Sequence, residues 1–193
     1  MSDSASSSVR RLLVTGTTGG IGGAVRDAAR AGGWSVVEVN RGGFDSSLGP
    51  DPVDGIVFAT GTCPVKPLAQ LTDEEFRETF EVNCGLFVRL MRRIVAERLY
   101  NPAGTKVVAI SSVSAVEGWP GGAAYCASKG ALSAVCRALD AELRPRGISV
   151  AALEPRYVKT RMFDRCAGRM GVDPSLAQDP ESFAREVLRL LER

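Results

Sequence analysis

The chain has 193 residues, of which 45% are apolar and 24% charged, and its formal net charge is +2. This composition is typical of a globular protein, and no stretch approaches the ~20 apolar residues that span a bilayer. The basic residues are scattered, so we expect neither nucleic acid nor a membrane as a partner. Histidine is absent, which excludes histidine-based triads and histidine metal ligands, and we expect no bound metal.

The five cysteines are odd in number and form no Cys-x-x-Cys pair. They indicate free thiols in a reducing, cytoplasmic compartment. Residues 1–8 are rich in serine and contain no apolar segment, which favours a disordered tail over a signal peptide. We expect residues 9–193 to form a single domain.

In chain order, short apolar runs predict strands and apolar residues at helical spacing predict helices. The predicted strands cover residues 10–16, 34–40, 54–61, 105–112 and 148–155, and the predicted helices cover 21–33, 71–100, 123–147 and 179–193. Thr72 and Glu75 form a capping-box pattern at the start of the second helix. The alternation of strands and helices predicts an α/β fold, a doubly wound parallel sheet of the Rossmann type with helices on both faces.

A glycine-rich turn, Thr-Gly-x3-Gly-x-Gly, runs from Thr15 to Gly22 between the first strand and the first helix. Glycine permits a tight turn and a close backbone approach to a pyrophosphate, and the amides of a helix N-terminus attract phosphate. The alternative is a turn without a ligand. The position of the motif after the first strand favours nucleotide binding, and hence a dinucleotide-binding domain.

This spacing resembles that of the short-chain dehydrogenase/reductase family, and the resemblance extends from about Leu12 to Thr160. Ser112, Tyr125 and Lys129 match the Ser…Tyr-x3-Lys signature of the family, and Asn83 matches its helix asparagine. The resemblance implies that Tyr125 exchanges a proton with a carbonyl or alcohol substrate, while Ser112 hydrogen-bonds the substrate oxygen. It also implies that Lys129 tunes the tyrosine and binds the nicotinamide ribose, and that Asn83 belongs to a proton relay through water.

The spacing of Tyr125 and Lys129 puts both side chains on one face of a helix. A free tyrosine has a pKa of about 10, and an adjacent ammonium together with a charged nicotinamide ring would lower it. The alternative is that Tyr125 and Lys129 are a helix surface pair and that Ser112 is an ordinary strand-end hydroxyl.

The second strand ends in Asn40 and Arg41, where folds that bind NAD usually carry an acidic residue. A guanidinium can hold a 2′-phosphate, so we expect NADP(H), although Arg41 could also be a solvated surface residue. The candidate cofactor-binding residues are Thr15, Gly16, Thr18, Gly20, Ile21, Gly22, Asn40, Arg41, Ala59, Thr60, Gly61, Tyr125, Lys129, Pro155, Val158 and Thr160.

The sequence departs from the family pattern at several points. Ala59 replaces the central asparagine of the family's Asn-Asn-Ala-Gly motif, a structural tie for the sheet, and Arg156 follows Pro155 where relatives usually carry glycine. The fold is expected to be shortened between the second strand and residue 54 and to lack the usual last strand, which leaves the substrate pocket more open. Residues that could line this pocket are Trp119, Met162, Phe163, Met170, Arg161 and Arg165.

We therefore expect an NADP(H)-dependent oxidoreductase, a carbonyl reductase, that acts on a small-molecule carbonyl or alcohol. The alternatives are a redox-silent NADP-binding or scaffold protein of the same fold, and a non-redox cyclase or dehydratase that uses Tyr125 as acid or base. A homodimer is expected through the helices over 73–99 and 125–144, where Ala127, Ala131 and Ala134 would permit close packing, although they suit an internal contact equally well.

Overall fold

The structure is a computed structural model that describes residues 9–40 and 48–192. The predicted tail over residues 1–8 and the candidate residue Arg41 lie outside the described residues. The elements, in chain order, are β1 (Arg11–Thr15), α1 (Gly20–Ala31), β2 (Ser35–Val39), β3 (Gly55–Phe58), η1 (Leu68–Gln70), α2 (Asp73–Phe80), η2 (Glu81–Gly85), α3 (Leu86–Ala96), β4 (Thr105–Ile110), η3 (Val113–Ala115), α4 (Ala123–Leu143), η4 (Arg144–Arg146), β5 (Ile148–Leu153), α5 (Arg161–Met170), η5 (Pro174–Leu176) and α6 (Pro180–Glu192).

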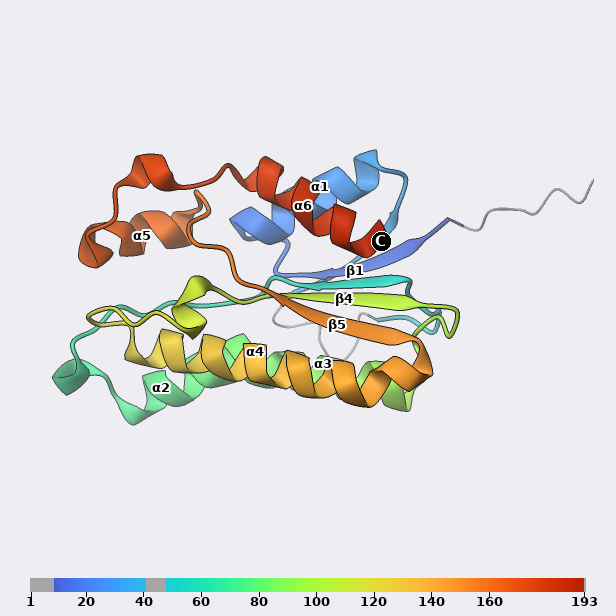
Figure 1. The fold of residues 1–193 in the computed structure, drawn as a ribbon, viewed down its shortest axis with the longest axis horizontal. Helices are drawn as coiled ribbons and strands as arrows, with labels where there is room; N and C mark the ends of the chain where they lie inside the picture. The colour runs from blue at the N-terminus through green and yellow to red at the C-terminus, as the bar shows by residue number, and fades with distance from the viewer. Residues whose placement is uncertain (1–8, 41–47, 193) are drawn as a thin grey trace, which may run out of the picture.

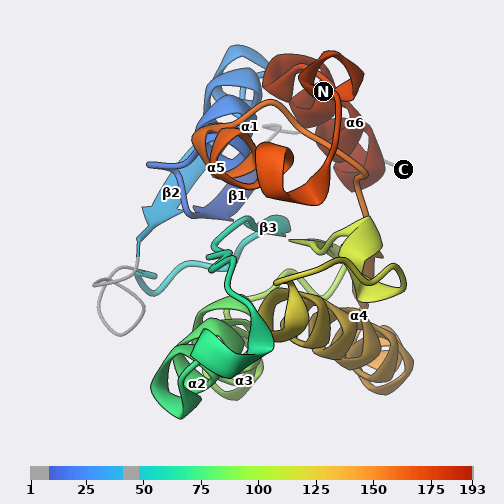
Figure 2. The same ribbon diagram turned by 90° about the vertical axis from the view of Figure 1, so that its left-hand side faces the viewer.

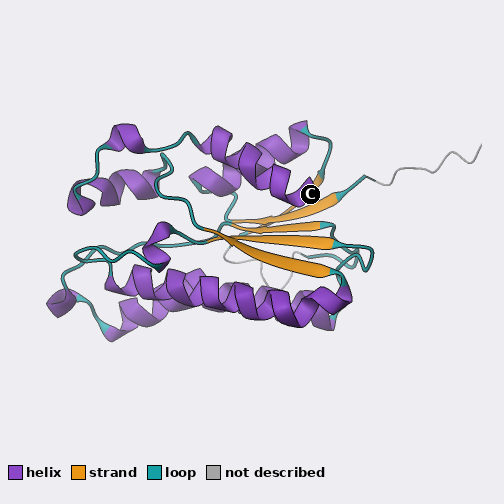
Figure 3. Cartoon of the chain, viewed as in Figure 1, coloured by secondary structure: helices purple, strands orange, loops and turns teal. Residues whose placement is uncertain are grey.

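The described strands form one parallel sheet in the order β2-β1-β3-β4-β5. Parallel strands need crossover connections, and here helices cover both faces of the sheet (Figure 3). The predicted Rossmann-type fold is therefore confirmed. Because the chain crosses from β2 over β1 to β3, the direction of winding changes at β1, and the carboxyl ends of the strands diverge there to leave a site for a ligand.

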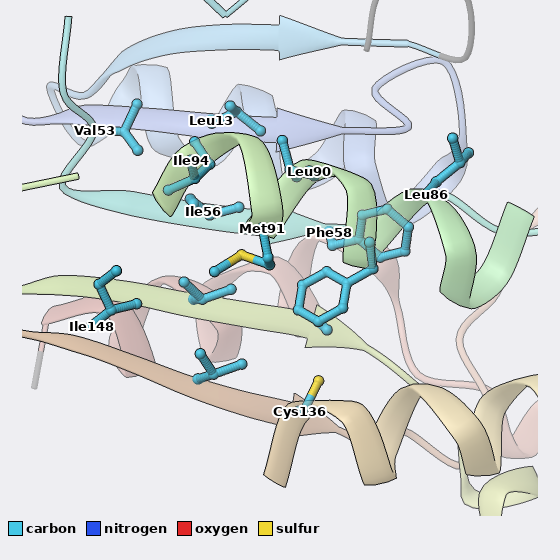
Figure 4. Packing of buried hydrophobic residues seen from close by; sticks show 14 of the residues in the cluster. Leu13, Val53, Ile56, Phe58, Leu86, Leu90, Met91, Ile94, Cys136 and Ile148 are labelled. Carbon is cyan, nitrogen blue, oxygen red and sulfur yellow. The ribbon is translucent and has the colours of Figure 1, made fainter. Parts of the chain in front are cut away.

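The two faces of the sheet carry two apolar clusters. Alternate residues of β1 point to opposite faces, so that Leu12 and Val14 belong to the cluster under α1 and α6, whereas Leu13 belongs to the cluster under α3 and α4. Figure 1 shows α1 and α6 on one side of the sheet and α2, α3 and α4 on the other. In the second cluster the rings of Phe58 and Phe87 lie 5.3 Å apart (Figure 4).

The connection between β2 and β3 is short, as predicted. Its described part, residues 48–54, contains no helix and contributes a single bridge between Val53 and Tyr100. Leu48 from this connection is 2% exposed and packs into the cluster under α3. One buried leucine thus covers part of the sheet that a crossover helix covers in a longer connection. At the other edge, β5 pairs with β4 alone among the described strands.

Two helical features differ from the sequence prediction. The single helix predicted over 71–100 consists of α2, a π-helical turn at η2 and α3. A further helix, α5, was not predicted. It begins after Thr160, whose hydroxyl accepts a hydrogen bond from the Phe163 amide at 3.2 Å, and it ends at Gly171 with φ of +66°. Over residues 9–40 and 48–192, none of the helices combines the length and hydrophobicity that a transmembrane span requires.

Candidate active site

A cleft of about 570 Å³ lies at the carboxyl ends of the parallel strands, a size usual for small-molecule sites. Figure 2 looks onto these strand ends, with α5 on the side of α1 and α4 on the opposite side of the sheet. The cleft brings together most of the site residues predicted from the sequence. Those that line it are Gly16, Thr18, Gly20, Ile21, Gly22, Asn40, Ala59, Thr60, Gly61, Ser112, Tyr125, Lys129, Pro155, Val158 and Thr160.

Gly16, Gly20 and Gly22 of the glycine-rich turn have no room for a side chain. A Cβ atom at Gly22 would lie 2.3 Å from the Gly16 carbonyl oxygen, and one at Gly20 would lie 2.5 Å from the Thr160 methyl group. Gly16 adopts φ of +70° and packs against the backbone of Ala59. The turn is therefore tight, and it leads directly into the N-terminus of α1, where free amides and the helix dipole favour a phosphate.

Thr15 lies beneath the cleft and ties two strand ends together. Its hydroxyl is fully buried and accepts hydrogen bonds from the amides of Ala59 and Thr60, at 3.1 and 3.2 Å. The Thr60 hydroxyl also donates to it at 2.9 Å. These contacts join β1 to the segment after β3, so a pair of threonines ties the sheet together even though Ala59 replaces the family's asparagine.

Asn83 is fully buried and lies in the π-helical turn. The Thr62 amide donates to its Oδ1 at 2.7 Å, while its Nδ2 donates to the Thr62 carbonyl at 2.9 Å and to Ser128 Oγ at 2.8 Å. The Ser128 hydroxyl donates in turn to the Tyr125 carbonyl at 2.8 Å. Asn83 therefore fixes the loop after β3 to the helix that carries Tyr125. The extra residue of a π turn is frequent at functional sites.

Ser112, Tyr125 and Lys129 meet at one end of the cleft. Ser112 follows β4, its hydroxyl accepts a hydrogen bond from the Ser114 amide at 3.1 Å, and it lines the cleft together with Tyr125. Lys129, one turn after Tyr125 on α4, lies with its Nζ 5.8 Å from the centre of the tyrosine ring. This Nζ donates to the Ile110 carbonyl at 2.7 Å, which anchors the lysine to the end of β4.

Burial dominates the ionisation of both catalytic candidates. It raises the pKa of Tyr125 above the usual value of about 10, and the neighbouring Ser112 hydroxyl only partly offsets this. Burial lowers the pKa of Lys129 to about 8. The expected lowering of the tyrosine pKa depends on a charged nicotinamide ring together with the Lys129 ammonium, and it stays a prediction. Burial alone acts in the opposite direction.

The opposite end of the cleft is closed by the end of β2. The Thr17 hydroxyl donates to Asn40 Oδ1 at 3.3 Å. The acidic residue of β2, Glu38, contacts Arg30 at 2.7 Å and Arg26 at 3.6 Å. A hydrogen bond with Thr17 and these two arginines hold the pKa of Glu38 below its usual range. The Glu38 carboxylate therefore forms ion pairs with two arginines of α1.

The end of the cleft near α5 contains contacts that sequence reasoning did not identify. Arg156 binds Glu117 through both guanidinium nitrogens, at 2.7 and 3.2 Å. Cys63 and Cys166 also line the cleft. A cysteine two residues after the Thr60-Gly61 segment was a usable signal for Cys63, whereas the contact of Glu117 with Arg156 joins two loops and has no local signature. The six residues expected to line this pocket, Trp119, Arg161, Met162, Phe163, Arg165 and Met170, all do so. In the described part of the chain, no three potential metal-ligating side chains are grouped.

Comparison with known proteins agrees with this architecture. The family described as short chain dehydrogenase matches residues 45–169. A 3-oxoacyl-(acyl-carrier-protein) reductase from Rickettsia felis is 27% identical over 180 residues, which cover 79% of this chain and 74% of the relative. An L-xylulose reductase from Bos taurus is 28% identical over 179 residues, covering 79% and 73%.

Solved structures show the same fold. A short-chain dehydrogenase from Streptomyces avermitilis superposes with a TM-score of 0.78 at 25% identity, covering 96% of this chain and 85% of its own. An actinorhodin polyketide ketoreductase with NADPH gives a TM-score of 0.82 at 21% identity, covering 95% and 90%.

Proposed function

The chain belongs to the short-chain dehydrogenase family, and we propose that it is an NADP(H)-dependent oxidoreductase that transfers a hydride between nicotinamide and a carbonyl or alcohol substrate. The observation that carries this proposal is the position of the Tyr125 side chain. It lines the cleft together with Ser112 and lies one helical turn from Lys129, and the same cleft contains the glycine-rich turn.

The chain's own residues fit a nicotinamide dinucleotide. The tight glycine turn at the N-terminus of α1 suits a pyrophosphate, and the cleft continues from Asn40 at one end to Lys129 at the other. Glu38, the acidic residue of β2, is bound by two arginines, which supports NADP(H) over NAD(H) because no free carboxylate of β2 opposes a 2′-phosphate. Arg41 is the proposed partner of that phosphate.

When bound, the cofactor supplies the hydride, and the protein orients the reactants and handles the proton. In the reductive direction, the Ser112 hydroxyl holds the substrate oxygen and Tyr125 donates its phenolic proton to that oxygen. Because the pKa of Lys129 is about 8, its side chain is mostly an ammonium at neutral pH and stabilises the phenolate that remains. Asn83 holds the loop after β3 against the helix that carries Tyr125, through hydrogen bonds with Thr62 and Ser128. We therefore assign it a positioning role.

Two other readings use the same fold. A redox-silent NADP-binding or scaffold protein would have no physical need for a tyrosine and a lysine buried in the cleft, which argues against it. A non-redox cyclase or dehydratase would use the acid–base function of Tyr125 and consume no cofactor. Measurements of NADPH absorbance with a panel of ketones, aldehydes and quinones, and of the products with and without cofactor, separate these readings.

The decisive variant is Tyr125→Phe, which removes the proton donor and keeps the ring. We expect turnover to fall by about 10²–10⁴-fold, the usual contribution of a positioned acid, while NADPH affinity measured by calorimetry stays close to that of the wild type. NADPH should bind more tightly than NADH. An unchanged rate in the variant would disprove the mechanism, and absence of NADPH binding to the wild type would disprove the function.

Two further expectations belong to this proposal. Ala127 and Ala134 are exposed on the outer face of α4, whereas Ala131 packs partly into the core, and the exposed pair supports a homodimer through this helix. The five free cysteines support a reducing, cytoplasmic location. Sedimentation of the purified protein tests the first expectation.

A further inference from the structure

Two cysteines face each other across the cleft. Cys63 follows β3 and Cys166 belongs to α5, and their sulfur atoms lie 3.4 Å apart. Both residues line the cleft. The sulfurs need to approach by only about 1.3 Å to reach the ~2.05 Å length of a disulfide bond. Two segments that are far apart in the sequence therefore place a pair of free thiols within reach of a covalent bond.

The two thiols differ in how firmly their backbones are held. Cys63 follows Thr62, whose amide and carbonyl are both hydrogen-bonded to buried Asn83. Cys166 is carried by α5, which touches the same loop at a second place, where Arg169 donates to the Val65 carbonyl. One thiol is therefore fixed to the catalytic core, and the other moves with the helix that borders the cleft.

The surroundings of the two sulfur atoms differ, and they make Cys166 the better nucleophile of the two. The contact with Cys63, together with the nearby Arg165 and Arg169, lowers the pKa of Cys166. The contact with Cys166, followed by burial, raises the pKa of Cys63. The two arginines therefore favour the thiolate, the reactive form, at Cys166 over Cys63.

Cys126 is the other cysteine near this site, and its thiol is engaged elsewhere. Its Sγ contacts the Glu117 carbonyl at 3.7 Å. Cys84 and Cys136 are buried in the apolar cluster under α3 and α4. The pair formed by Cys63 and Cys166 is therefore set apart from the remaining thiols by both contact and position.

We propose that Cys63 and Cys166 are a thiol modification site, which a hydroperoxide converts into a reversible disulfide that fastens α5 to the catalytic core. The Cys166 thiolate attacks one peroxide oxygen and breaks the oxygen–oxygen bond, giving a sulfenic acid and, after protonation of the leaving oxygen, water or an alcohol. The Cys63 sulfur then attacks the sulfenic sulfur, loses its proton, and expels hydroxide, which becomes water. Two thiols are oxidised by two electrons and one peroxide is reduced.

The disulfide affects the cleft because of where α5 begins. Thr160, just before the helix, packs against the glycine-rich turn, and Met162 lies beside Gly61 near the lysine Nζ. Helix α5 borders the cleft, and a covalent bond to Cys63 would hold the helix in place beside the glycine-rich turn. The predicted loss of turnover rests on the proposed function, whereas formation of the cross-link does not.

The test is treatment of the purified full chain with hydrogen peroxide, followed by peptide mapping without reduction. We expect a peptide that links Cys63 to Cys166, and a loss of mass equal to two hydrogen atoms that dithiothreitol reverses. Cys63→Ser and Cys166→Ser should each abolish the link, while Cys126→Ser, the matched control, should retain it. Absence of the linked peptide in the wild type, or its replacement by a link to Cys126, would overturn the proposal.

A second readout tests the consequence of the cross-link. Binding of NADPH, followed by the change in its fluorescence after rapid mixing, should slow in the oxidised protein and recover after reduction. The rate in Cys63→Ser should not respond to peroxide. A linked protein that binds NADPH at an unchanged rate would refute the effect on α5, and a reduced protein that does not bind NADPH at all would instead refute the proposed function.

Discussion

The two sides of the cleft are held together by different kinds of contact. On the core side, Asn83 and Lys129 are buried, and their side chains form hydrogen bonds of 2.7–2.9 Å with backbone or buried groups. On the outer side, the segment that leads into α5 has backbone hydrogen bonds with Gln178, but its side-chain ties are exposed or long: the ion pair of Arg156, whose side chain is 60% exposed, and a 3.5 Å contact from Arg161 to the Thr18 carbonyl.

This difference matters because the two kinds of contact have different energies. Removing one partner from a buried hydrogen bond leaves the other unsatisfied and costs about 1–3 kcal/mol, whereas an exposed ion pair contributes about 0–1 kcal/mol. The side-chain contacts that hold the proton-transfer groups in position are therefore expected to be stronger than those of the outer side. A cleft that must admit both a cofactor and a substrate benefits from this division.

The largest effect on stability is expected for Asn83→Ala. The variant leaves the amide and carbonyl of Thr62 without their partners, and we expect the free energy of unfolding to fall by about 3 kcal/mol. Asn101→Ala is the matched control, because this partly exposed side chain bonds Asp54 and the Ala103 amide. Urea unfolding should show a loss of about 1 kcal/mol for the control. Equal losses in the two variants would contradict the idea that burial makes the contacts of Asn83 the stronger ones.

Lys129→Met is expected to have the next largest effect on stability. At neutral pH this variant should raise the free energy of unfolding, whereas Asn83→Ala lowers it. Burial lowers the pKa of Lys129 to about 8, below the value of about 10.4 in an unfolded chain. The folded state therefore binds this proton less tightly, and the burial penalty is fully present below pH 8 and disappears as the pH rises through about 10.4. The charged lysine destabilises the folded protein at pH 7.

We expect Lys129→Met to raise the free energy of unfolding at pH 7 by about 1–2 kcal/mol, since the lost penalty exceeds the cost of an unpaired Ile110 carbonyl. Urea unfolding at pH 7 and pH 10 measures this, with Lys106→Met on β4 as the control for the loss of one lysine. The advantage of the variant over the wild type should shrink at the higher pH. An advantage that does not change with pH would show that burial of the charge is not its cause.

The core side of the cleft could largely be predicted from the sequence. The Thr15–Gly22 turn and the i, i+4 pair of Tyr125 and Lys129 depend on local spacing, which can be read directly from the sequence. The hydrogen-bond partners of Asn83 and Lys129 could not be predicted. Asn83 finds Thr62 and Ser128 through a π-helical turn, and Lys129 reaches the Ile110 carbonyl because α4 packs against the end of β4.

The outer side was less accessible to sequence reasoning. Helix α5 is short and carries many charged side chains, although its buried residues Phe163, Cys166 and Ala167 follow helical spacing, and its start is determined by the Thr160 cap. The approach of Cys63 to Cys166 and the pairing of Glu117 with Arg156 both join segments that are distant in the chain. Burial of Tyr125, which raises its pKa, depends on tertiary packing and also has no local signature.

The smallest effect is expected for the pair of Glu117 and Arg156. The two side chains are 49% and 60% exposed, so solvent screens their attraction, and we expect Glu117→Gln to change the free energy of unfolding by less than about 0.5 kcal/mol. A double-mutant cycle with Arg156→Ala, measured by urea unfolding, should give a coupling energy below about 1 kcal/mol. Because Arg156 lines the end of the cleft near α5, its replacement should alter KM for the carbonyl more than kcat. A coupling energy above about 2 kcal/mol would instead make this contact of the outer side as strong as those of the core side.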